Sequence, residues 1–560
     1  MRRCLLPLLI QRSITDYKFL SMLSGIRSLN QPTCWKGHNA FQEVCVSWES
    51  AIEELRRRES LAQRMGEQVK VDRHHNAGKL TVRERIDALL DEGTFHEIGA
   101  ISGKAEYDED GNLIDLRASN FVMGRGKINS RYVVVAGDDF TVRGGAADAS
   151  IREKPIFAEQ MANEYRMPIV RLIDGTGGGG SVKSLEIDGM TYVPANPGWD
   201  WVVHNLSTVP VVGLALGSVA GLGAARAVTS HYSLMVKGLS QLFVAGPPVV
   251  ARVTGPITKE ELGGSGIHTR NGAIDDEVES EAEAFERTAR FLSYLPSSVH
   301  ELPPRGPITD DVDRREESLI SAVPVDKRKV YKMRKIINNV VDQDSFFEIG
   351  RNHGKSAITG FARLDGWPVA ILANDPYIYG GSWTAEASHK VTRFVDLANT
   401  FHLPVVHLVD NPGFLIGLES EKAGTIRHGA RSLAALYQAD VPWCTVIIRK
   451  VFGVAGAGNS NHSKLFFRYA WPSADTGSLP IAGGLEAAYR SDLEASDDPD
   501  ALLAEIEERL TRVCSPFRTA EAFRVEEIID PRDTRPLLCE FANLAAPLRK
   551  TGPASVPYRP

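Results

Sequence analysis

The chain has 560 residues, of which 43% are hydrophobic and 24% are charged, as in ordinary globular proteins. A formal net charge of -7 offers no basic stripe for nucleic acid, and no apolar run reaches the roughly 20 residues that cross a membrane, so neither is an expected partner. The six cysteines form no close pair and the histidines lack metal-ligand spacing, so no metal site is expected. Two domains are expected, because one hydrophobic core rarely serves so long a chain.

Residues 1–40 differ in composition from the rest of the chain. They carry several arginines and lysines but a single acid, Asp16. An acid-poor, amphipathic start is typical of a mitochondrial presequence, although a disordered or wrongly assigned start has the same composition. We therefore expect the mitochondrial matrix if this segment is a presequence, and the cytoplasm otherwise.

Strands and helices alternate in the first half. Apolar spacing predicts helices at Trp48–Arg64 and from Lys79, where Thr81 and Glu84 have the spacing of a capping box. The elements predicted next are strands at Tyr132–Ala136, Ile169–Ile173 and Val209–Leu216, and helices at Ile156–Tyr165 and Glu277–Leu295. Strands that are apolar throughout and separated by helices indicate a mainly parallel sheet covered on both faces.

The second half repeats this arrangement after a linker. Proline and mixed charge between Glu301 and Lys329 predict the linker. The strands predicted beyond it are Val369–Ala373, Val405–Val409 and Cys444–Ile448, and the last helix is predicted near Ala501–Val513. We expect domains at 41–302 and 330–549, a linker at 303–329, and a tail at 550–560. The prolines of the C-terminal segment suggest that it wraps onto a neighbouring subunit.

The duplication is also visible residue by residue. Met167–Gly177 and Leu403–Gly413 are both apolar runs that end in Asp-x-x-Gly, the pattern of a buried strand followed by a tight turn. Phe-x-Glu-Ile-Gly precedes each copy, at Phe95–Gly99 and at Phe346–Gly350. We predict an α/β fold built from two copies of one domain.

A glycine-rich turn follows the next strand in each copy, at Gly217–Gly223 and at Phe452–Gly458. A strand that turns sharply into a helix leaves the first helical amides unpaired, and such amides stabilise an oxygen on which negative charge develops. Small residues are also needed to pack a helix on a sheet, but the same turn in both halves favours an oxyanion-binding role. The first turn is not a dinucleotide fingerprint, because Arg226 occupies its last small-residue position.

Two loops at strand ends are expected to lie over these sites. Gly177–Ser181 has the composition of a flexible linker, but it directly follows a buried strand, where bare backbone can approach a ligand. Asp410–Phe414 has the equivalent place in the second half, and Tyr377–Ser382 either lines the same cleft or packs in the core. No Walker, GxSxG or HExxH sequence occurs, which excludes P-loop, serine-hydrolase and zinc-protease chemistry.

From about Gly78 to Leu548 the chain resembles the carboxyltransferase (beta) subunits of biotin-dependent acyl-CoA carboxylases, the propionyl-CoA and methylcrotonyl-CoA carboxylase group. The motifs that carry the resemblance are Lys79–Ile86, Asp139–Gly145, Glu261–Thr269, Val409–Gly417, Ile426–Ala430, Ile448–Lys450 and Ala470–Ala474. The resemblance implies two tandem crotonase-like domains of the ClpP/crotonase superfamily, the first for acyl-CoA and the second for biotin.

The resemblance also implies site residues. The first oxyanion hole, for the thioester enolate, corresponds to the amides of Gly221 and Leu222, and the second, for the biotin ureido oxygen, to those of Val454 and Ala455. The acyl-CoA side is implied to include Gly178, Gly179, Gly180, Gly221 and Gly223, and the biotin side Asn411, Pro412, Gly413, Phe414, Gly453 and Ala457.

Three of these positions depart from the family. Leu222 and Val454 replace common glycines, so their amides can donate only if each turn avoids left-handed angles at these residues. Ala457 stands where propionyl-CoA enzymes carry an aspartate linked to substrate choice. The acyl group is therefore not identified by the sequence.

The implied reaction removes a proton beside the thioester, after which the enolate attacks the carboxyl group carried by biotin. Biotin itself is thought to be the base, so the protein supplies positioning and electrostatics, with no metal in this chain. The sequence has no Met-Lys-Met for biotin attachment and no ATP-binding domain. An alpha subunit with biotin carboxylase and biotin carboxyl carrier domains is implied, as is a hexamer in which the two sites meet across a dimer interface.

Three alternatives stay open. A biotin-dependent decarboxylase in a membrane complex runs the same transfer in reverse. A hydratase or hydrolase on the crotonase fold would need a carboxylate near the Gly221 turn, and none is evident from the sequence. A non-catalytic scaffold would keep the fold with turns that no longer bind ligand.

Overall fold

The computed structural model describes residues 47–560, with gaps at 146–150, 176–185, 187–188, 192, 194 and 463. Met1–Glu53 and Glu54–Pro560 are separate units of the chain, and both large sheets lie in the second unit. The basic segment 1–40 lies outside the described residues, so its interpretation as a presequence stays a prediction.

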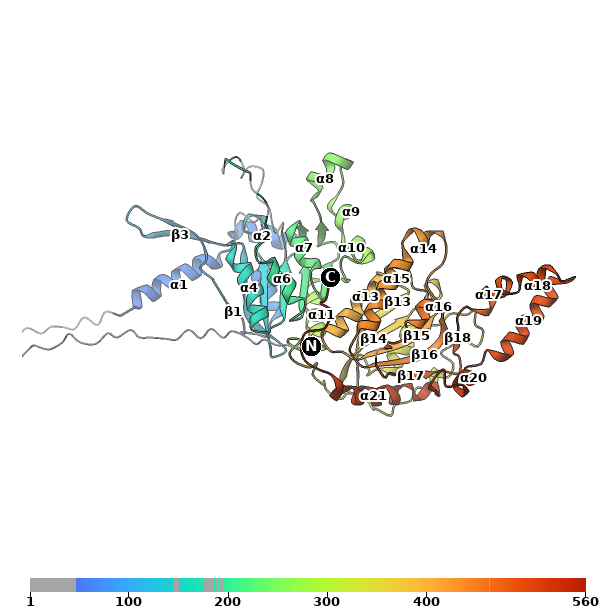
Figure 1. Ribbon diagram of the computed structural model, residues 1–560. Coiled ribbons are helices and arrows are strands. Elements are labelled where there is room, and N and C mark those ends of the chain that lie inside the picture. The colour runs from blue at the N-terminus through green and yellow to red at the C-terminus, as the bar shows by residue number, and fades with distance from the viewer. Residues whose placement is uncertain are drawn as a thin grey trace, which may run out of the picture. The chain divides into compact units, whose positions relative to one another are not determined.

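Two sheets with the same strand order carry the fold (Figure 1). The first has the order β1-β4-β5-β6-β7-β9-β11, and the second has the order β12-β13-β14-β15-β16-β17-β19, with β18 paired to β16. Both sheets are mainly parallel, as predicted, and their leading strands are antiparallel. The first sheet contains His96–Glu97, Phe121–Ile128, Arg131–Asp138, Ile169–Ile173, Val211–Ala215, Tyr232–Val236 and Asp276–Val278. The second contains Phe347–Ile349, Ala357–Leu364, Trp367–Asn374, Val405–Asn411, Trp443–Phe452, Phe467–Ala470 and Glu527–Ile528, with β18 at Asp475–Gly477.

Helices cover both sheets because the strand side chains are apolar on both faces. In the first half α3 (Val82–Leu89) packs with α11 (Glu281–Ser293), and α4 (Glu153–Glu164) packs with α6 (Trp199–Asn205). In the second half, α13 (Ala385–Thr400) lies beside α15 (Thr425–Gln438), while α12 (Met333–Val340) contacts α21 (Thr534–Ala545). Successive residues of β16 alternate between these layers: Trp443 packs in the core with α13, and Cys444 in the core with α12 and α21. The two halves share a core, since Phe291 and Phe361 pack with ring centroids 5.7 Å apart.

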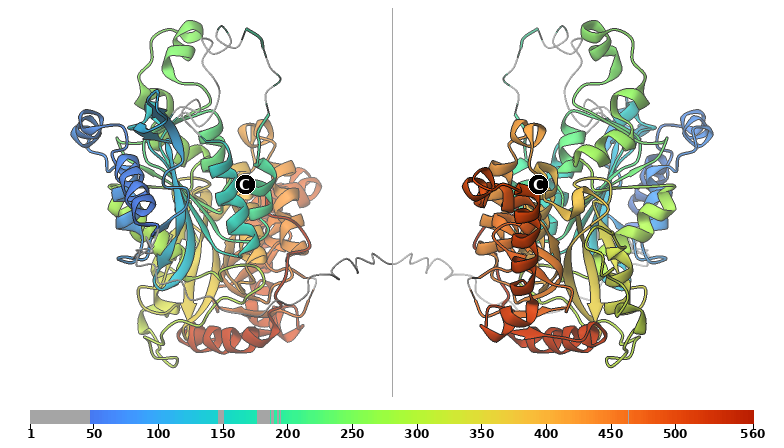
Figure 2. Two further views of the ribbon diagram at one scale, coloured as in Figure 1. Left: turned by 90° about the vertical axis from the view of Figure 1, so that its left-hand side faces the viewer. Right: turned by 90° about the vertical axis from the view of Figure 1, so that its right-hand side faces the viewer.

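The remaining elements are shorter or lie outside the two sheets. They are α1 (Glu49–Gln63), α2 (Gln68–Asn76), β2 (Gly103–Tyr107), β3 (Leu113–Ala118), β8 (Ser218–Ala220), α7 (Leu222–Val228), β10 (Gln241–Phe243), α8 (Pro247–Thr254), α9 (Lys259–Gly263), α10 (Ser265–Asn271), α14 (Leu418–Lys422), α16 (Gly453–Ala457), α17 (Ile481–Ala488), α18 (Arg490–Glu494), α19 (Pro499–Val513) and α20 (Pro516–Glu521). Helix α8 has no buried residue and stands clear of the first sheet in Figures 1 and 2. Among the described helices, none has both the length and the apolar character needed to cross a lipid bilayer.

Local signals predicted the named elements to within a few residues, and two differences are informative. The Thr81–Glu84 capping box is confirmed, with both reciprocal hydrogen bonds present. The predicted helix at Glu277–Leu295 begins later, at Glu281, because Asp276–Val278 adds an edge strand to the first sheet before Ser280 caps the helix. The helix at Pro499–Val513 is not the last, since α20 and α21 follow it.

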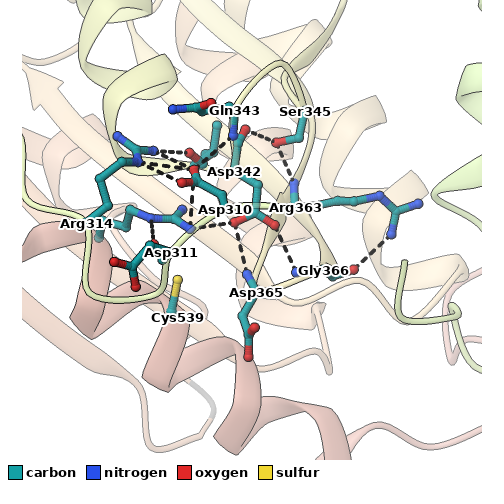
Figure 3. A network of polar contacts seen from close by, with 12 residues as sticks. Asp310, Asp311, Arg314, Asp342, Gln343, Ser345, Arg363, Asp365, Gly366 and Cys539 are labelled. Carbon is teal, nitrogen blue, oxygen red and sulfur yellow. Dashed lines mark hydrogen bonds and ion pairs between the residues drawn. The ribbon is translucent and has the colours of Figure 1, made fainter. Parts of the chain in front are cut away.

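The segment predicted as a linker is partly fixed to the second half (Figure 3). The Arg535 guanidinium of α21 donates from Nε to the Asp311 carbonyl at 2.8 Å and pairs with Asp342 Oδ1 at 2.9 Å. Arg314 pairs with Asp310 at 2.8 Å in the same network. These buried contacts hold residues 310–314 against α21, whereas the predicted boundaries at 303 and 329 stay a prediction.

The C-terminal tail packs on its own chain around Tyr558, and its expected contact with a neighbouring subunit stays a prediction. The Gly552 N–H donates to the Val299 carbonyl at 2.7 Å. Tyr558 is only 3% exposed, and its ring lies 4.6 Å from that of His231. An apolar ring two residues from the end therefore anchors the tail.

Candidate active site

The first glycine turn joins β8 to α7 and is held by a neighbouring strand. β8 pairs in parallel with β10, and the Gly221 N–H extends this pairing by donating to the Phe243 carbonyl at 3.2 Å. Gly221 has φ 60° and ψ −124°, a conformation that side chains with a Cβ strongly disfavour. The Gly221 amide is therefore occupied, and its predicted role as an oxyanion donor is wrong.

The free amides of this turn lie one residue further on. Helix α7 begins at Leu222, and the N–H groups of Leu222 and Gly223 have no acceptor among the residues that the structure describes. Leu222 is absent from the residues with left-handed φ, so the replacement of the family's glycine causes no strain here. The free amides of this turn are thus those of Leu222 and Gly223, of which only Leu222 belongs to the predicted pair.

The second turn has the same construction. Gly453 has φ 61° and is the first residue of α16, directly before Val454, whereas Gly221 directly precedes α7. Within the described part of the chain, the N–H groups of Val454 and Ala455 have no acceptor. The Val454 side chain is exposed and its φ is not left-handed, while Ala455 is buried. The predicted pair Val454 and Ala455 is thus available to donate to a ligand.

The aspartates of the two Asp-x-x-Gly repeats lie behind these turns. Asp174 is fully buried and pairs with Arg85 at 3.0 Å and Lys79 at 3.2 Å. Asp410 is equally buried and pairs with Arg449 at 3.1 Å, while the Tyr331 hydroxyl donates to it at 2.8 Å. Both carboxylates are neutralised by fixed partners, so they act as anchors of the strand ends.

A second pair of equivalent turns supports the same strand ends. Arg143 and Tyr379 have φ of 56° and 50°, and two glycines with left-handed φ follow each of them. A Cβ on Gly145 would lie 2.7 Å from the Asp174 carbonyl oxygen, and one on Gly381 would lie 2.3 Å from that of Asp410. Only glycine therefore allows this close approach.

The loop predicted to bind biotin lies beside the second turn. Asn411 pairs with Val451 in the β15–β16 ladder, two residues before Gly453. Its Oδ1 accepts the Gly413 N–H at 3.0 Å, whereas its buried Nδ2 has no partner among the described residues. An amide donor buried without an acceptor is unfavourable, so a ligand or water is expected to satisfy it.

The other residues implied for the biotin side are spread around this loop. Pro412 and Phe414 are half-buried, and the Phe414 ring packs so closely on Gly429 that a Cβ there would lie 2.3 Å from it. Ala457 is exposed at the end of α16. Tyr377 and Tyr379 line a separate open cavity of about 730 Å³ with Leu415.

The acyl-CoA side is only partly described. Gly178, Gly179 and Gly180 lie outside the described residues. Beside the first turn is a cavity of about 100 Å³ whose lining includes Leu222, Phe121, Trp199, Asp138 and Arg226. Arg226 lies four residues after Leu222, on the same side of α7, a spacing that could have identified it in the sequence.

Two carboxylates also line this cavity, contrary to the expectation that none lies near the turn. Glu159 is held by Arg171, which donates to both of its oxygens at 2.8 Å. Asp138 accepts the Asp174 N–H at 3.3 Å and lies 3.8 Å from Arg226. Burial raises the Asp138 pKa, and the Arg226 charge opposes that shift.

Two histidines, one in each half, are fully buried in the described cores. His231 and His407 are fully buried, and burial lowers the pKa of each to about 3, so both are neutral at physiological pH. No group of His, Cys, Asp and Glu in the described residues has the arrangement of a metal site.

Comparison with known proteins agrees with this geometry. The family described as Carboxyl transferase domain matches residues 73–555. The propionyl-CoA carboxylase beta chain of Homo sapiens is 34% identical over 508 residues, covering 89% of this chain and 92% of that one. The methylmalonyl-CoA carboxyltransferase 12S subunit of Propionibacterium freudenreichii subsp. shermanii is 33% identical over 518 residues, covering 91% and 97%.

A solved structure shows the same fold. The crystal structure of transcarboxylase 12S, a hexamer assembly with methylmalonyl-coenzyme A bound, aligns with a TM-score of 0.81 and 31% identity over 91% of this chain and 99% of that one. The predicted fold of two tandem crotonase-like domains is confirmed by this likeness and by the two matching sheets. With most of its length matched by one family, this chain belongs to the carboxyl transferase family.

Proposed function

We propose that this chain transfers a carboxyl group from a biotin carried by a partner to an acyl-CoA, as the carboxyltransferase subunit of an acyl-CoA carboxylase. One observation carries the proposal. Two equivalent glycine turns, in a chain of the carboxyl transferase family, each present a pair of free amides: Leu222 with Gly223, and Val454 with Ala455.

The first pair of amides suits the thioester. Removal of a proton beside the thioester moves negative charge onto its carbonyl oxygen, and two fixed N–H donors stabilise that charge. Gly221 holds the backbone so that both amides follow one another at the start of α7. Loss of one such donor costs about 3 kcal/mol in the barrier.

The second pair suits the ureido oxygen of biotin, which supplies the carboxyl group when it is bound. Val454 and Ala455 would donate to that oxygen, and the unpartnered Nδ2 of Asn411 offers one more buried donor nearby. In this reaction the chain contributes orientation and electrostatic stabilisation, through amides that the two turns hold in place.

The partners follow from the proposed reaction. The chain needs an alpha subunit with biotin carboxylase and biotin carboxyl carrier domains, and we propose a hexamer in which the first turn of one subunit faces the second turn of another. The sequence likeness to a propionyl-CoA carboxylase beta chain and the structural likeness to the 12S hexamer support this proposal.

The test is transfer of labelled bicarbonate to a panel of acyl-CoAs by the chain reconstituted with its alpha subunit and ATP. Leu222→Pro removes one N–H at the first helical position, where proline is tolerated, and Leu222→Ala keeps it. We expect the proline variant to lose about 100- to 1,000-fold in kcat and the alanine variant to stay near wild type. Equal activity of the two variants in an assembled complex would overturn the role of this amide.

Asp138 gives a second candidate function a specific basis. A carboxylate with a raised pKa beside an oxyanion-binding turn could serve as the base of a hydratase. Hydration of crotonyl-CoA by the isolated chain, abolished by Asp138→Asn, would favour that function over carboxyl transfer.

A further inference from the structure

Arg226 carries a nearly buried charge that the described protein does not satisfy with hydrogen bonds. It is 9% exposed, and its guanidinium has five potential donors. None of them donates to a residue that the structure describes; its contacts are the ion pair with Asp138 at 3.8 Å and the Phe121 ring, 5.5 Å from Cζ to centroid. Its nitrogens are not among the enclosed atoms that lack a partner, so they face the open space of the cavity, where a ligand acceptor can reach them.

Arg226 lies close to the first glycine turn. Arg226 and Leu222 line the same cavity, and residues four apart share one side of a helix, about 6 Å apart along its axis. Helical side chains lean toward the N-terminus, which directs this guanidinium toward the turn. The cavity of about 100 Å³ exceeds the roughly 10–15 Å³ that one water requires, so it has room for part of an acyl chain.

The other charges of the cavity leave room for an anion. Glu159 is already paired with Arg171 through two hydrogen bonds of 2.8 Å. Asp138 lies beyond hydrogen-bond distance of Arg226, and burial favours its neutral form. The second half has no counterpart, because Gly458 stands at the position equivalent to Arg226 when Gly453 is matched to Gly221.

We propose that the acyl group accepted here carries a carboxylate at its far end, that is, a dicarboxylic acyl thioester, and that Arg226 binds this carboxylate. The inference rests on the proposed function, since it takes the thioester oxygen to lie at the Leu222 and Gly223 amides. Arginine matches a carboxylate with two parallel hydrogen bonds, which makes it a selective group at such a position.

The test compares acyl-CoAs of equal chain length with and without the terminal carboxylate, by isothermal titration and by KM in the reconstituted enzyme. The pairs are succinyl-CoA with butyryl-CoA, and glutaryl-CoA with pentanoyl-CoA. We expect at least one dicarboxylic member to bind wild type about tenfold or more tightly than its neutral partner. Arg226→Met should abolish that preference, and Arg226→Lys should retain part of it.

Equal affinities within both pairs in wild type would overturn the inference, even if the Arg226 variants fail to fold. Sensitivity of methylmalonyl-CoA alone to Arg226→Met would assign Arg226 to the transferred carboxyl group instead. No binding of any acyl-CoA would overturn the proposed function itself.

Discussion

The N–H of Gly221 donates to the carbonyl oxygen of Phe243 at 3.2 Å, which commits this amide to the pairing between β8 and β10. Gly221 therefore contributes a backbone conformation, with φ 60° and ψ −124°, and the next two residues contribute the free amides. Gly453, with φ 61°, has the same place before Val454. The duplicated feature is one glycine followed by two donors.

Gly221→Ala should destabilise the turn. A residue with a Cβ in this conformation costs about 1–3 kcal/mol, and relief of that strain would move the Leu222 and Gly223 amides. We expect a lower thermal midpoint and reduced carboxyl transfer. Gly266→Ala is the control, because Gly266 lies in α10 without a left-handed φ, and a Cβ added there would meet no atom within 4 Å. Equal thermal midpoints for the two variants would contradict the expected backbone strain at residue 221.

Val454→Pro should inactivate the second turn without unfolding it. Proline fits the start of a helix, and the variant loses only the N–H and an exposed side chain. We expect about a 100- to 1,000-fold fall in kcat with an unchanged oligomeric state by light scattering. Val454→Ala keeps the N–H and should stay near wild-type activity. A fully active proline variant would remove Val454 from the proposed site.

Much of the fold could be predicted because its signals are local. The β6 strand matches its predicted bounds at Ile169–Ile173, since five buried residues end at a turn sequence. The capping box at Thr81 has a fixed spacing, and the duplication repeats the strand-and-turn pattern across the chain. The glycine turns with free amides could be predicted in the same way, because each is a short run of small residues directly after an apolar strand.

Contacts between distant segments account for the errors. The Gly221 N–H donates to the Phe243 carbonyl, and this contact depends on the pairing of two short strands, β8 and β10, that are apart in the sequence. Asp138 and Arg226 meet at one cavity although 88 positions separate them in the sequence. Tyr558 packs on His231 and Arg535 on Asp311, and no sequence pattern specifies either contact.

Arg85→Met should be strongly destabilising. Arg85 is 1% exposed and pairs with both Asp174 and Glu281, so its loss leaves two buried carboxylates without this cation. Breaking such a buried pair costs about 3–5 kcal/mol. Arg512→Met is the control, because the Arg512–Glu508 pair is 72% and 68% exposed, and pairs of this kind contribute about 0–1 kcal/mol. Urea unfolding of the two variants would measure the difference, and similar midpoints would contradict it.

Lys390 should make the free energy of unfolding rise with pH in the alkaline range. Burial lowers its pKa to about 8, below the ordinary value of 10.5. Between these two pKa values the unfolded chain binds the lysine proton more tightly than the folded chain does. The free energy of unfolding therefore rises with pH in this window. Below pH 8 the folded lysine is charged, and burial of that charge has its full destabilising effect.

The comparison with Lys390→Met isolates this effect. Wild type should gain about 2 kcal/mol relative to the variant between pH 7.5 and 9.5, as the native lysine loses its proton. The variant also loses the hydrogen bonds that Lys390 donates to the carbonyls of Ala357 at 2.8 Å and His353 at 3.2 Å, a loss that is present at both pH values. Denaturant titrations at both pH values would show the gain, and a constant difference would contradict the lowered pKa.

Tyr558→Ala should release the C-terminal tail. The ring is 3% exposed and packs on His231, which in turn packs on Phe401 at 4.8 Å, so truncation leaves a cavity between the two halves. Removal of a buried aromatic side chain costs about 3–5 kcal/mol, whereas Tyr558→Phe keeps the ring and should cost less than about 1.5 kcal/mol. Thermal unfolding measures both changes, and limited proteolysis should cut the tail at 550–560 in the alanine variant alone. Resistance of that variant to proteolysis would mean that the Gly552 hydrogen bond to Val299, at 2.7 Å, holds the tail without the ring.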